Sequence, residues 1–293
     1  MYSALAGSVK PPTRDGICSP VSVDHYENFP VASWLCPPQL RPAVVALYHF
    51  ARTADDIADE GDANATTRRQ LLADYRADLA RVYAGQPPSE RWRERVFAAV
   101  AQERHRLDPA LLTLLVEAFE QDLEPPRYQD RAHLLDYCRR SANPVGRQLL
   151  ALYGQTDPDS LAQSDAICSA LQLINFWQDF SRDGPRGRLY VPQSDLDAHG
   201  VSADDILACR DSPAARALTQ ALCQWARALM QQGAPLALRL PGRAGWELRL
   251  VVQGGLAILA KIEAMHFASL LRRPRLTAWD APALLWRALR MRA

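Results

Sequence analysis

The stretch Ala54-Asp55-Asp56-Ile57-Ala58-Asp59-Glu60-Gly61 places four acidic side chains at the end of a predicted helix. Asp55 and Asp59 are four residues apart and share one helix face, and Gly61 is a typical residue at which a helix ends. The helix dipole favours cations at this end, and aspartate is a poor residue for a helix interior. Because local stability disfavours this arrangement, the stretch indicates a bound divalent cation, with a solvated acidic helix end as the alternative.

A second stretch, Asn175-Phe176-Trp177-Gln178-Asp179-Phe180-Ser181-Arg182-Asp183-Gly184-Pro185, repeats this pattern. Asn175, Asp179 and Asp183 follow one another at four-residue spacing, and Gly184-Pro185 predicts another helix end. Hard oxygen ligands of this kind suit Mg²⁺ rather than Zn²⁺. The candidate Mg²⁺ ligands of the two stretches are Asp55, Asp56, Asp59, Asn175, Asp179 and Asp183.

Arginines accompany both acidic stretches. Arg52 lies one turn before Asp55, and Arg182, Arg186 and Arg188 cluster at the second stretch. A guanidinium group binds phosphate oxygens in a bidentate manner, so arginine and Mg²⁺ together predict a diphosphate site. The alternative is that the arginines only neutralise the acids in a salt-bridge cluster.

Helical periodicity recurs along most of the chain. Residues that favour helix dominate, glycine is sparse at 14 residues, and no alternating pattern typical of a strand is evident. We expect an irregular N-terminal arm over residues 1–20 and one all-α domain over residues 21–293. Asn64 and Asp108-Pro109 are helix-start signals. The predicted helices cover residues 38–60, 65–84, 89–105, 109–123, 131–154, 158–183, 213–236, 244–271 and 278–291.

Composition excludes several other classes of protein. The 34 basic and 33 acidic residues give a net charge of +1, which argues against broad phosphate neutralisation of a nucleic acid. No apolar run approaches the roughly 20 residues of a membrane span, and no signal-peptide pattern is seen. A cytoplasmic location is therefore expected. The six cysteines lack CxxC spacing, and nucleotide-binding loop motifs are absent.

These motifs resemble the squalene/phytoene synthase family. The matching stretches are 48–59, Tyr137-Cys138, and 175–183 running into Arg186-Gly187-Arg188-Leu189-Tyr190-Val191-Pro192. The resemblance implies an all-α isoprenoid synthase fold, in which the acidic motifs face each other across a central cavity between antiparallel helices. It also implies Mg²⁺ on a leaving diphosphate, with Arg52 and Arg188 neutralising its charge.

Three tyrosines, Tyr48, Tyr137 and Tyr190, match family tyrosines at the cavity and are the expected catalytic residues. Aromatic faces suit a carbocation in a dry site, and Tyr137 would position the diphosphate or an attacking water. Phe29 and Gln178 are expected at the substrate, although core packing is the alternative for Phe29. Six apolar residues either line a prenyl tunnel or pack in the core: Val44, Val45, Leu149, Leu152, Leu171 and Ile174.

Three departures from the family pattern are similar to its bacterial hydroxysqualene synthase branch, which serves hopanoid-type squalene supply. Ala142-Asn143-Pro144 replaces an Ala-Gly stretch, Gln178 replaces a common arginine, and Gly254-Gly255 stands where many relatives carry an aromatic residue. The branch implies that presqualene diphosphate is ionised, that water captures the carbocation, and that no nicotinamide is consumed.

The same resemblance implies partners and leaves alternatives. A separate synthase would supply presqualene diphosphate, and a flavin-dependent enzyme would reduce the product. Peripheral contact with the inner face of the membrane is a further expectation, although Arg272-Arg273-Pro274-Arg275 also fits a solvated loop. The alternatives are presqualene diphosphate or squalene synthesis from two farnesyl diphosphates, phytoene synthesis, and a non-catalytic lipid-binding scaffold.

Overall fold

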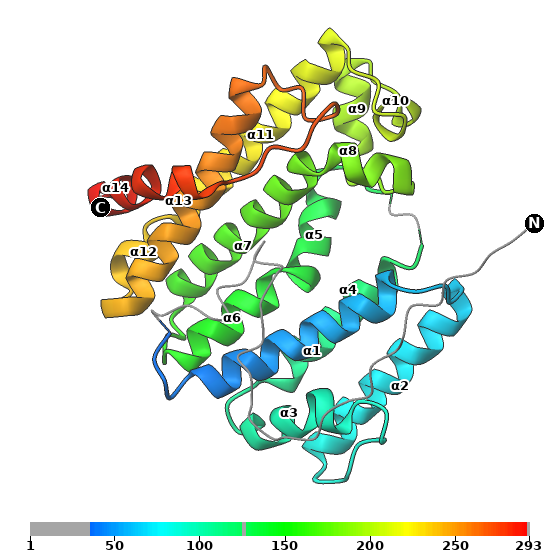
Figure 1. Cartoon of the computed structure of the whole chain (residues 1–293), viewed down its shortest axis with the longest axis vertical. Helices are drawn as coiled ribbons and strands as arrows, with labels where there is room; N and C mark the ends of the chain where they lie inside the picture. Colours follow the sequence, from blue (N-terminus) through cyan, green and yellow to red (C-terminus); the bar gives the residue numbers. More distant parts are fainter. Residues whose placement is uncertain (1–35, 125–126, 292–293) are drawn as a thin grey trace, which may run out of the picture.

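The computed structural model describes residues 36–124 and 127–291, and every regular element within them is a helix. The expectation of an all-α fold is therefore confirmed for the described residues (Figure 1). The predicted arm over residues 1–20 and the predicted substrate contact Phe29 both lie outside these residues.

The helices follow one another with short connections. Their bounds are α1 Arg41–Asp59, α2 Ala65–Tyr83, the π-helical turn η1 Arg93–Phe97, α3 Ala98–Glu103, α4 Pro109–Gln121, α5 Arg131–Ser141, α6 Asn143–Leu152, α7 Pro158–Gln178, α8 Phe180–Asp183, the 3₁₀ turn η2 Gly184–Arg186, α9 Gln193–His199, α10 Ala203–Leu207, α11 Pro213–Gly233, α12 Leu236–Arg239, α13 Gly242–Ala264, the 3₁₀ turn η3 Ala278–Asp280, and α14 Ala281–Arg290.

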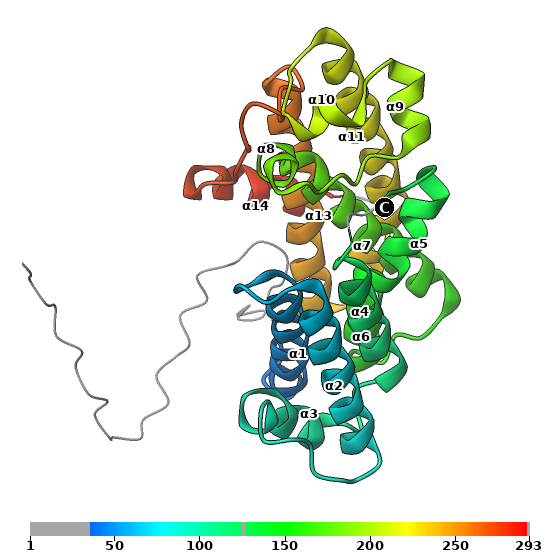
Figure 2. The same cartoon turned by 90° about the vertical axis from the view of Figure 1, so that its right-hand side faces the viewer.

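The described core consists of two hydrophobic clusters. One is built by α1 to α4, where Tyr75 packs between Phe50 and Phe97 at ring distances of 5.0 and 4.9 Å. The other is built mainly by α5, α7, α11 and α13. Figures 1 and 2 show α1 to α4 at one end of the molecule and α8 to α11 at the other. The two acidic stretches thus come from different clusters.

The predicted start of α2 and α4 is confirmed by capping. The Asn64 side chain accepts a hydrogen bond from the Thr67 amide at 2.9 Å, and Asp108 accepts one from the Ala110 amide at 2.8 Å. Apolar residues at helical spacing along α1, namely Ala43, Leu47, Phe50 and Ala54, are also buried. Beyond α1, Gly61 adopts a φ of 81°, a left-handed conformation that glycine takes without steric cost.

Three predicted helices are divided in the structure. The prediction over 131–154 is wrong at Ala142, where α5 ends and α6 begins, because Pro144 cannot donate a backbone hydrogen bond and restricts the residue before it. The predicted helix over 158–183 is interrupted at Asp179. The third, over 213–236, ends at Gly233 and is followed by the short α12.

Other boundaries also differ. Residues 89–92 form a turn ahead of η1, so the helix predicted over 89–105 is much shorter. Helix α13 ends at Ala264 rather than continuing to residue 271. The short helices α9 and α10 were not predicted, because seven-residue and five-residue helices carry too little periodicity to register.

Candidate active site

A polar cavity of about 890 Å³ lies between the two clusters. Its walls come from α1 and α4 on one side and from α5 to α8 and the following loop on the other. Among the predicted site residues, those that line the cavity are Tyr48, Arg52, Asp55, Asp59, Asn175 and Arg188. The packing therefore brings both acidic stretches to one space.

Arg52 organises the acidic end of α1. Its guanidinium contacts Asp55 Oδ2 at 2.8 Å and Asp56 Oδ1 at 2.8 Å. It also donates to Glu60 Oε1 at 2.6 Å. Asp56 is in addition 3.2 Å from Arg95 of η1. Glu60 also lines the cavity. It is the last acid of the first stretch and was not among the predicted Mg²⁺ ligands.

One carboxylate that lines the cavity, Asp55, and one carboxylate of the second stretch, Asp183, carry raised pKa values. Burial, followed by the negative charge of Asp59, raises the pKa of Asp55 to about 6. Burial and the charge of Asp179 raise the pKa of Asp183 to about 6 as well. Because an adjacent cation stabilises the ionised form of a carboxylate, these acids are arranged to gain most from positive charge.

An ion pair joins the two acidic stretches across the cavity. Arg188, which follows η2, donates a hydrogen bond to Asp59 at the end of α1. The Arg188 amide also donates to the Asp183 carbonyl at 3.0 Å. Gly187 lies between them in sequence at a φ of 76°, which permits the tight turn after η2. The Arg186-Gly187-Arg188 run therefore directs an arginine back to the first acidic stretch.

The second stretch is held by a loop that follows α13. Arg273 donates hydrogen bonds to both carboxylate oxygens of Asp179. The buried Gln178 amide donates to the Pro274 carbonyl at 2.8 Å, so this predicted substrate contact is engaged with backbone. Sequence reasoning missed Arg273 as a site residue, because 94 positions separate it from Asp179. The run Arg272-Arg273-Pro274-Arg275 could have pointed to this contact, but the sequence alone predicted a solvated loop or membrane contact for this run.

Four buried aromatic rings, including the predicted catalytic Tyr137 and Tyr190, form a group that is not part of the cavity lining. Tyr190 stacks on Phe176 with ring centres 3.8 Å apart and planes 6° from parallel. Tyr137 and Tyr128 lie 6.0 and 6.2 Å from the Tyr190 ring. All four rings are buried. Trp177, by contrast, is fully buried in the core near Phe180 and Trp225.

Asp122 is a half-buried acid that the sequence did not single out. The Tyr137 hydroxyl donates to Asp122 Oδ2 at 2.7 Å, while Asp122 Oδ1 has no hydrogen-bond partner among the described residues. Burial is the largest cause of a pKa raised to about 7, and the charges of Asp59 and Asp55 add to it. Tyr137 is therefore oriented by a carboxyl group that ionises near neutral pH.

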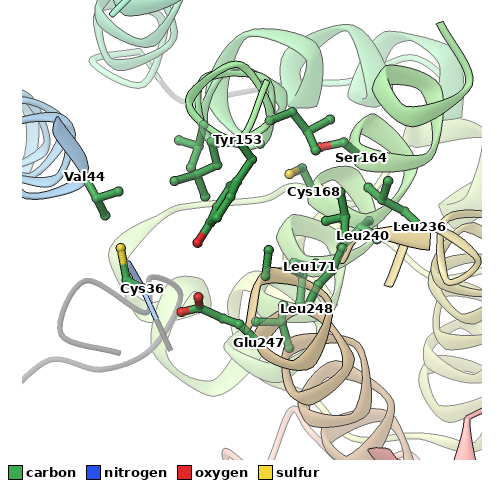
Figure 3. A pocket seen from close by; sticks show the side chains of 17 residues that line it. Cys36, Val44, Tyr153, Ser164, Cys168, Leu171, Leu236, Leu240, Glu247 and Leu248 are labelled. Atoms are coloured by element: carbon green, nitrogen blue, oxygen red, sulfur yellow. The ribbon is translucent and has the colours of Figure 1, made fainter. Parts of the chain in front are cut away.

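An apolar pocket of about 130 Å³ adjoins the polar cavity (Figure 3). Val145, Cys168 and Leu171 line both spaces. In Figure 3, Tyr153 and Glu247 extend toward the same space from opposite walls. Three of the six candidate tunnel residues line this pocket, namely Val44, Leu149 and Leu171. Leu152 and Ile174 instead pack in the two core clusters.

The donor set fits Mg²⁺, although no preformed ligand cluster is present in the described residues. Within 36–124 and 127–291, no group of three His, Cys, Asp or Glu side chains is placed to hold a metal ion. Mg²⁺ needs only one or two carboxylates, because water and substrate phosphate oxygens supply its other ligands. Asp55 and Asp59 on the α1 wall, together with Asn175 on the α7 wall, supply oxygen donors that match this requirement. The Mg²⁺ ligand set itself stays a prediction.

Comparisons with known proteins agree with the fold and with the motifs. The family model for squalene/phytoene synthase matches residues 23–280. The chain is 36% identical to a hydroxysqualene synthase of Rhodopseudomonas palustris, over 77% of this chain and 75% of that protein. It is 28% identical to a presqualene diphosphate synthase of Zymomonas mobilis, over 93% and 91%. A crystal structure of a squalene synthase from Alicyclobacillus acidocaldarius matches at 36% identity and a TM-score of 0.73, covering 83% and 90%.

Proposed function

The chain belongs to the squalene/phytoene synthase family, and from this premise we propose that it converts presqualene diphosphate to hydroxysqualene. The observation that carries the proposal is the cavity in which Asp55 and Asp59 of the first stretch meet Asn175 and the arginines of the second, beside an apolar pocket. A diphosphate group suits the charged part, and a prenyl chain suits the apolar part. The resemblance to hydroxysqualene synthases supports this choice among the activities of the family.

The proposed reaction requires separation of charge in a dry site. The bond between carbon and the diphosphate oxygen breaks, and both electrons leave with the oxygen. Water then adds to the carbocation and releases one proton, so neither oxidant nor reductant is consumed. Arg52 and Arg188 line the cavity and would neutralise the diphosphate as its charge develops.

Mg²⁺, held by Asp55, Asp59, Asn175, Asp179 and Asp183, would supply Lewis-acid stabilisation of the departing diphosphate. The arginines that now pair with these acids would then be free to contact the diphosphate directly. Asp56 is the weakest candidate of the predicted set, because it is engaged by both Arg52 and Arg95.

The aromatic group would face the hydrocarbon part of the substrate. Tyr190 and Phe176 present a stacked pair, and Tyr48 lines the polar cavity. Aromatic faces stabilise a cation electrostatically when water is excluded. Tyr137, held by Asp122, would position the water or the diphosphate. The catalytic roles of Tyr48, Tyr137 and Tyr190 are thus proposals, and substituting each tyrosine in turn can test them one by one.

Presqualene diphosphate synthesis from two farnesyl diphosphates is the second candidate. It is favoured by the match to a presqualene diphosphate synthase over 93% of this chain. Both reactions need a diphosphate site, so the acidic stretches support them equally.

Product analysis separates the candidates. Purified protein incubated with presqualene diphosphate and Mg²⁺, without nicotinamide, is expected to release hydroxysqualene and diphosphate. Squalene formed only after NADPH is added would overturn the proposal, as would turnover of farnesyl diphosphate alone. Asp55→Asn is expected to lower turnover at least about 100-fold. Asp62→Asn, an exposed acid just beyond α1, is the matched control and should keep normal turnover.

A further inference from the structure

Exposed apolar side chains concentrate near the end of the described chain. Of the seven large hydrophobic residues that are exposed in the described part of the chain, six fall between Leu271 and Leu289, and Trp279 is 93% exposed. We name this surface the C-terminal patch. It consists of Leu271, Leu276, Trp279, Leu285, Trp286 and Leu289. On α14, Leu285, Trp286 and Leu289 are exposed together, and neighbouring exposed apolar residues of this kind mark an interaction surface.

Helix α14 has apolar residues on two faces. Leu284 and Ala288 are turned inward, being half-buried and fully buried respectively. With 3.6 residues per turn, Pro282, Leu285, Trp286 and Leu289 fall within an arc of roughly 100° that faces outward. A surface helix normally presents polar residues there. Figure 2 shows α14 projecting from the side of the helical body, so this arc is open to a partner.

Positive charge accompanies the patch. Residues 271–291 contain five arginines and one acid, Asp280, in a chain whose total net charge is +1. Asp280 is paired with Lys261 at 3.0 Å. On α14, Arg290 lies beside the apolar arc with its guanidinium 4.1 Å from the Trp286 ring centre, and Arg287 is exposed on another side of the helix. The surface is therefore both apolar and cationic.

We propose that the C-terminal patch docks on the surface of an anionic lipid bilayer. Tryptophan and leucine enter the boundary between headgroups and acyl chains, while arginines contact lipid phosphates. Tryptophan is enriched at that boundary. Among the described helices, none is both long and apolar enough to cross a membrane, so the contact is made along the surface. An anionic bilayer complements the apolar arc and the arginines together.

The patch begins at the candidate active site. Pro274, between Leu271 and Leu276, accepts a hydrogen bond from Gln178, and Arg273 holds Asp179. Docking would therefore place the loop that closes on the second acidic stretch next to the bilayer. Vesicle binding requires no turnover, so the docking proposal can fail or succeed separately from the proposed function.

The test is co-sedimentation of the full chain with vesicles of phosphatidylcholine, alone or mixed with phosphatidylglycerol. We expect binding to the vesicles that contain phosphatidylglycerol, with affinity falling as salt is raised. Trp279→Ser/Trp286→Ser is expected to abolish binding. Arg287→Gln/Arg290→Gln should weaken it about 30-fold, since each basic residue near an anionic surface contributes substantially. Thermal melts of each variant verify that it is folded.

The matched control is Arg91→Gln/Arg104→Gln, which removes the same charge beside α3, away from α14 in both views. Arg91 also lies over a tryptophan, Trp92, at 5.3 Å. This control should bind like the unmodified chain. Equal binding to both kinds of vesicle, or equal loss in the control, would overturn the proposal. Concentration-dependent dimers that disappear in Trp279→Ser/Trp286→Ser, without vesicle binding, would assign the patch to a second copy instead.

Discussion

The carboxyl group of Asp122, which accepts a hydrogen bond from Tyr137 of the aromatic group, has a raised pKa. Its pKa of about 7, raised first by burial, exceeds the ordinary unfolded value of about 3.9. The folded chain therefore binds the Asp122 proton more tightly than the unfolded chain does. The associated stability is fully present below about pH 4 and is lost as pH rises through about 7. Ionisation of Asp122 therefore lowers the free energy of unfolding as pH rises through about 7.

Asp122→Asn removes this ionisation but keeps an oxygen that can accept from the Tyr137 hydroxyl. We expect its melting temperature to exceed that of the unmodified chain at pH 8, with the difference shrinking as pH falls toward 4.5. Melting curves across this range measure the difference. Asp62→Asn serves as the reference variant. A difference between Asp122→Asn and the unmodified chain that stays constant with pH would contradict the assignment.

At the scale of elements, the contact between α6 and α7 depends on glycine. A Cβ atom on Gly146 would lie 2.4 Å from Ser164 Oγ and 2.6 Å from Cys168 Sγ. These distances are shorter than van der Waals contact, so a larger residue requires the Ser164 and Cys168 side chains to rotate or α6 to move away from α7. The apolar pocket lies at this contact, since Gly146, Ser164 and Cys168 all line it. Because Gly146 has no side chain, the two helices approach closely at the pocket.

Gly146→Ala is expected to lower the free energy of unfolding by about 1–3 kcal/mol through overpacking. Gly254→Ala in α13 is the matched control, because its Cβ would meet only Leu276 Cδ1 at 3.8 Å. That change should be neutral or stabilise by about 0.5–1 kcal/mol, since alanine favours helix over glycine. Urea denaturation of both variants measures the two effects. Similar values for the pair would contradict the role given to the α6–α7 contact.

Element boundaries show where sequence prediction works. Asn64 and Asp108 start helices through hydrogen bonds that span two or three residues, so their effect is legible locally. The break after Ala142 follows from Pro144 and was overlooked because periodicity continues on both sides. The break at Asp179 has no such local signal. Its carboxylate is held by Arg273 from a distant loop, and long-range contacts of this kind override helix propensity.

At the scale of the whole molecule, the candidate site lies between the two hydrophobic clusters, and each cluster carries one of the two acidic stretches. Burial and neighbouring acids raise the pKa values of Asp55 and Asp183 to about 6. A ligand that neutralises both walls binds the folded chain alone and should stabilise it. Arg52 pairs with Asp55 and Arg188 pairs with Asp59, and these ion pairs partly offset the repulsion between the acids.

Mg²⁺ together with inorganic diphosphate is therefore expected to raise the melting temperature. Saturation at about 100 times the dissociation constant corresponds to about 2.7 kcal/mol of stabilisation. Asp55→Asn should lose most of the shift, whereas Asp62→Asn should keep it, and EDTA should reverse it. Differential scanning fluorimetry provides the measurement. An equal shift in Asp55→Asn would remove the metal role from the first acidic stretch.

The all-α class, the caps and the two acidic helix ends were legible from sequence, because each depends on spacing within one turn or two. The pairings that build the site were not. Arg188 meets Asp59 across 129 positions and Arg273 meets Asp179 across 94, while Tyr137 finds Asp122 through the packing of α5 on α4. Such partners are selected when separate hydrophobic clusters pack together. Local patterns therefore specified which residues carry charge, and long-range packing specified which charges face one another.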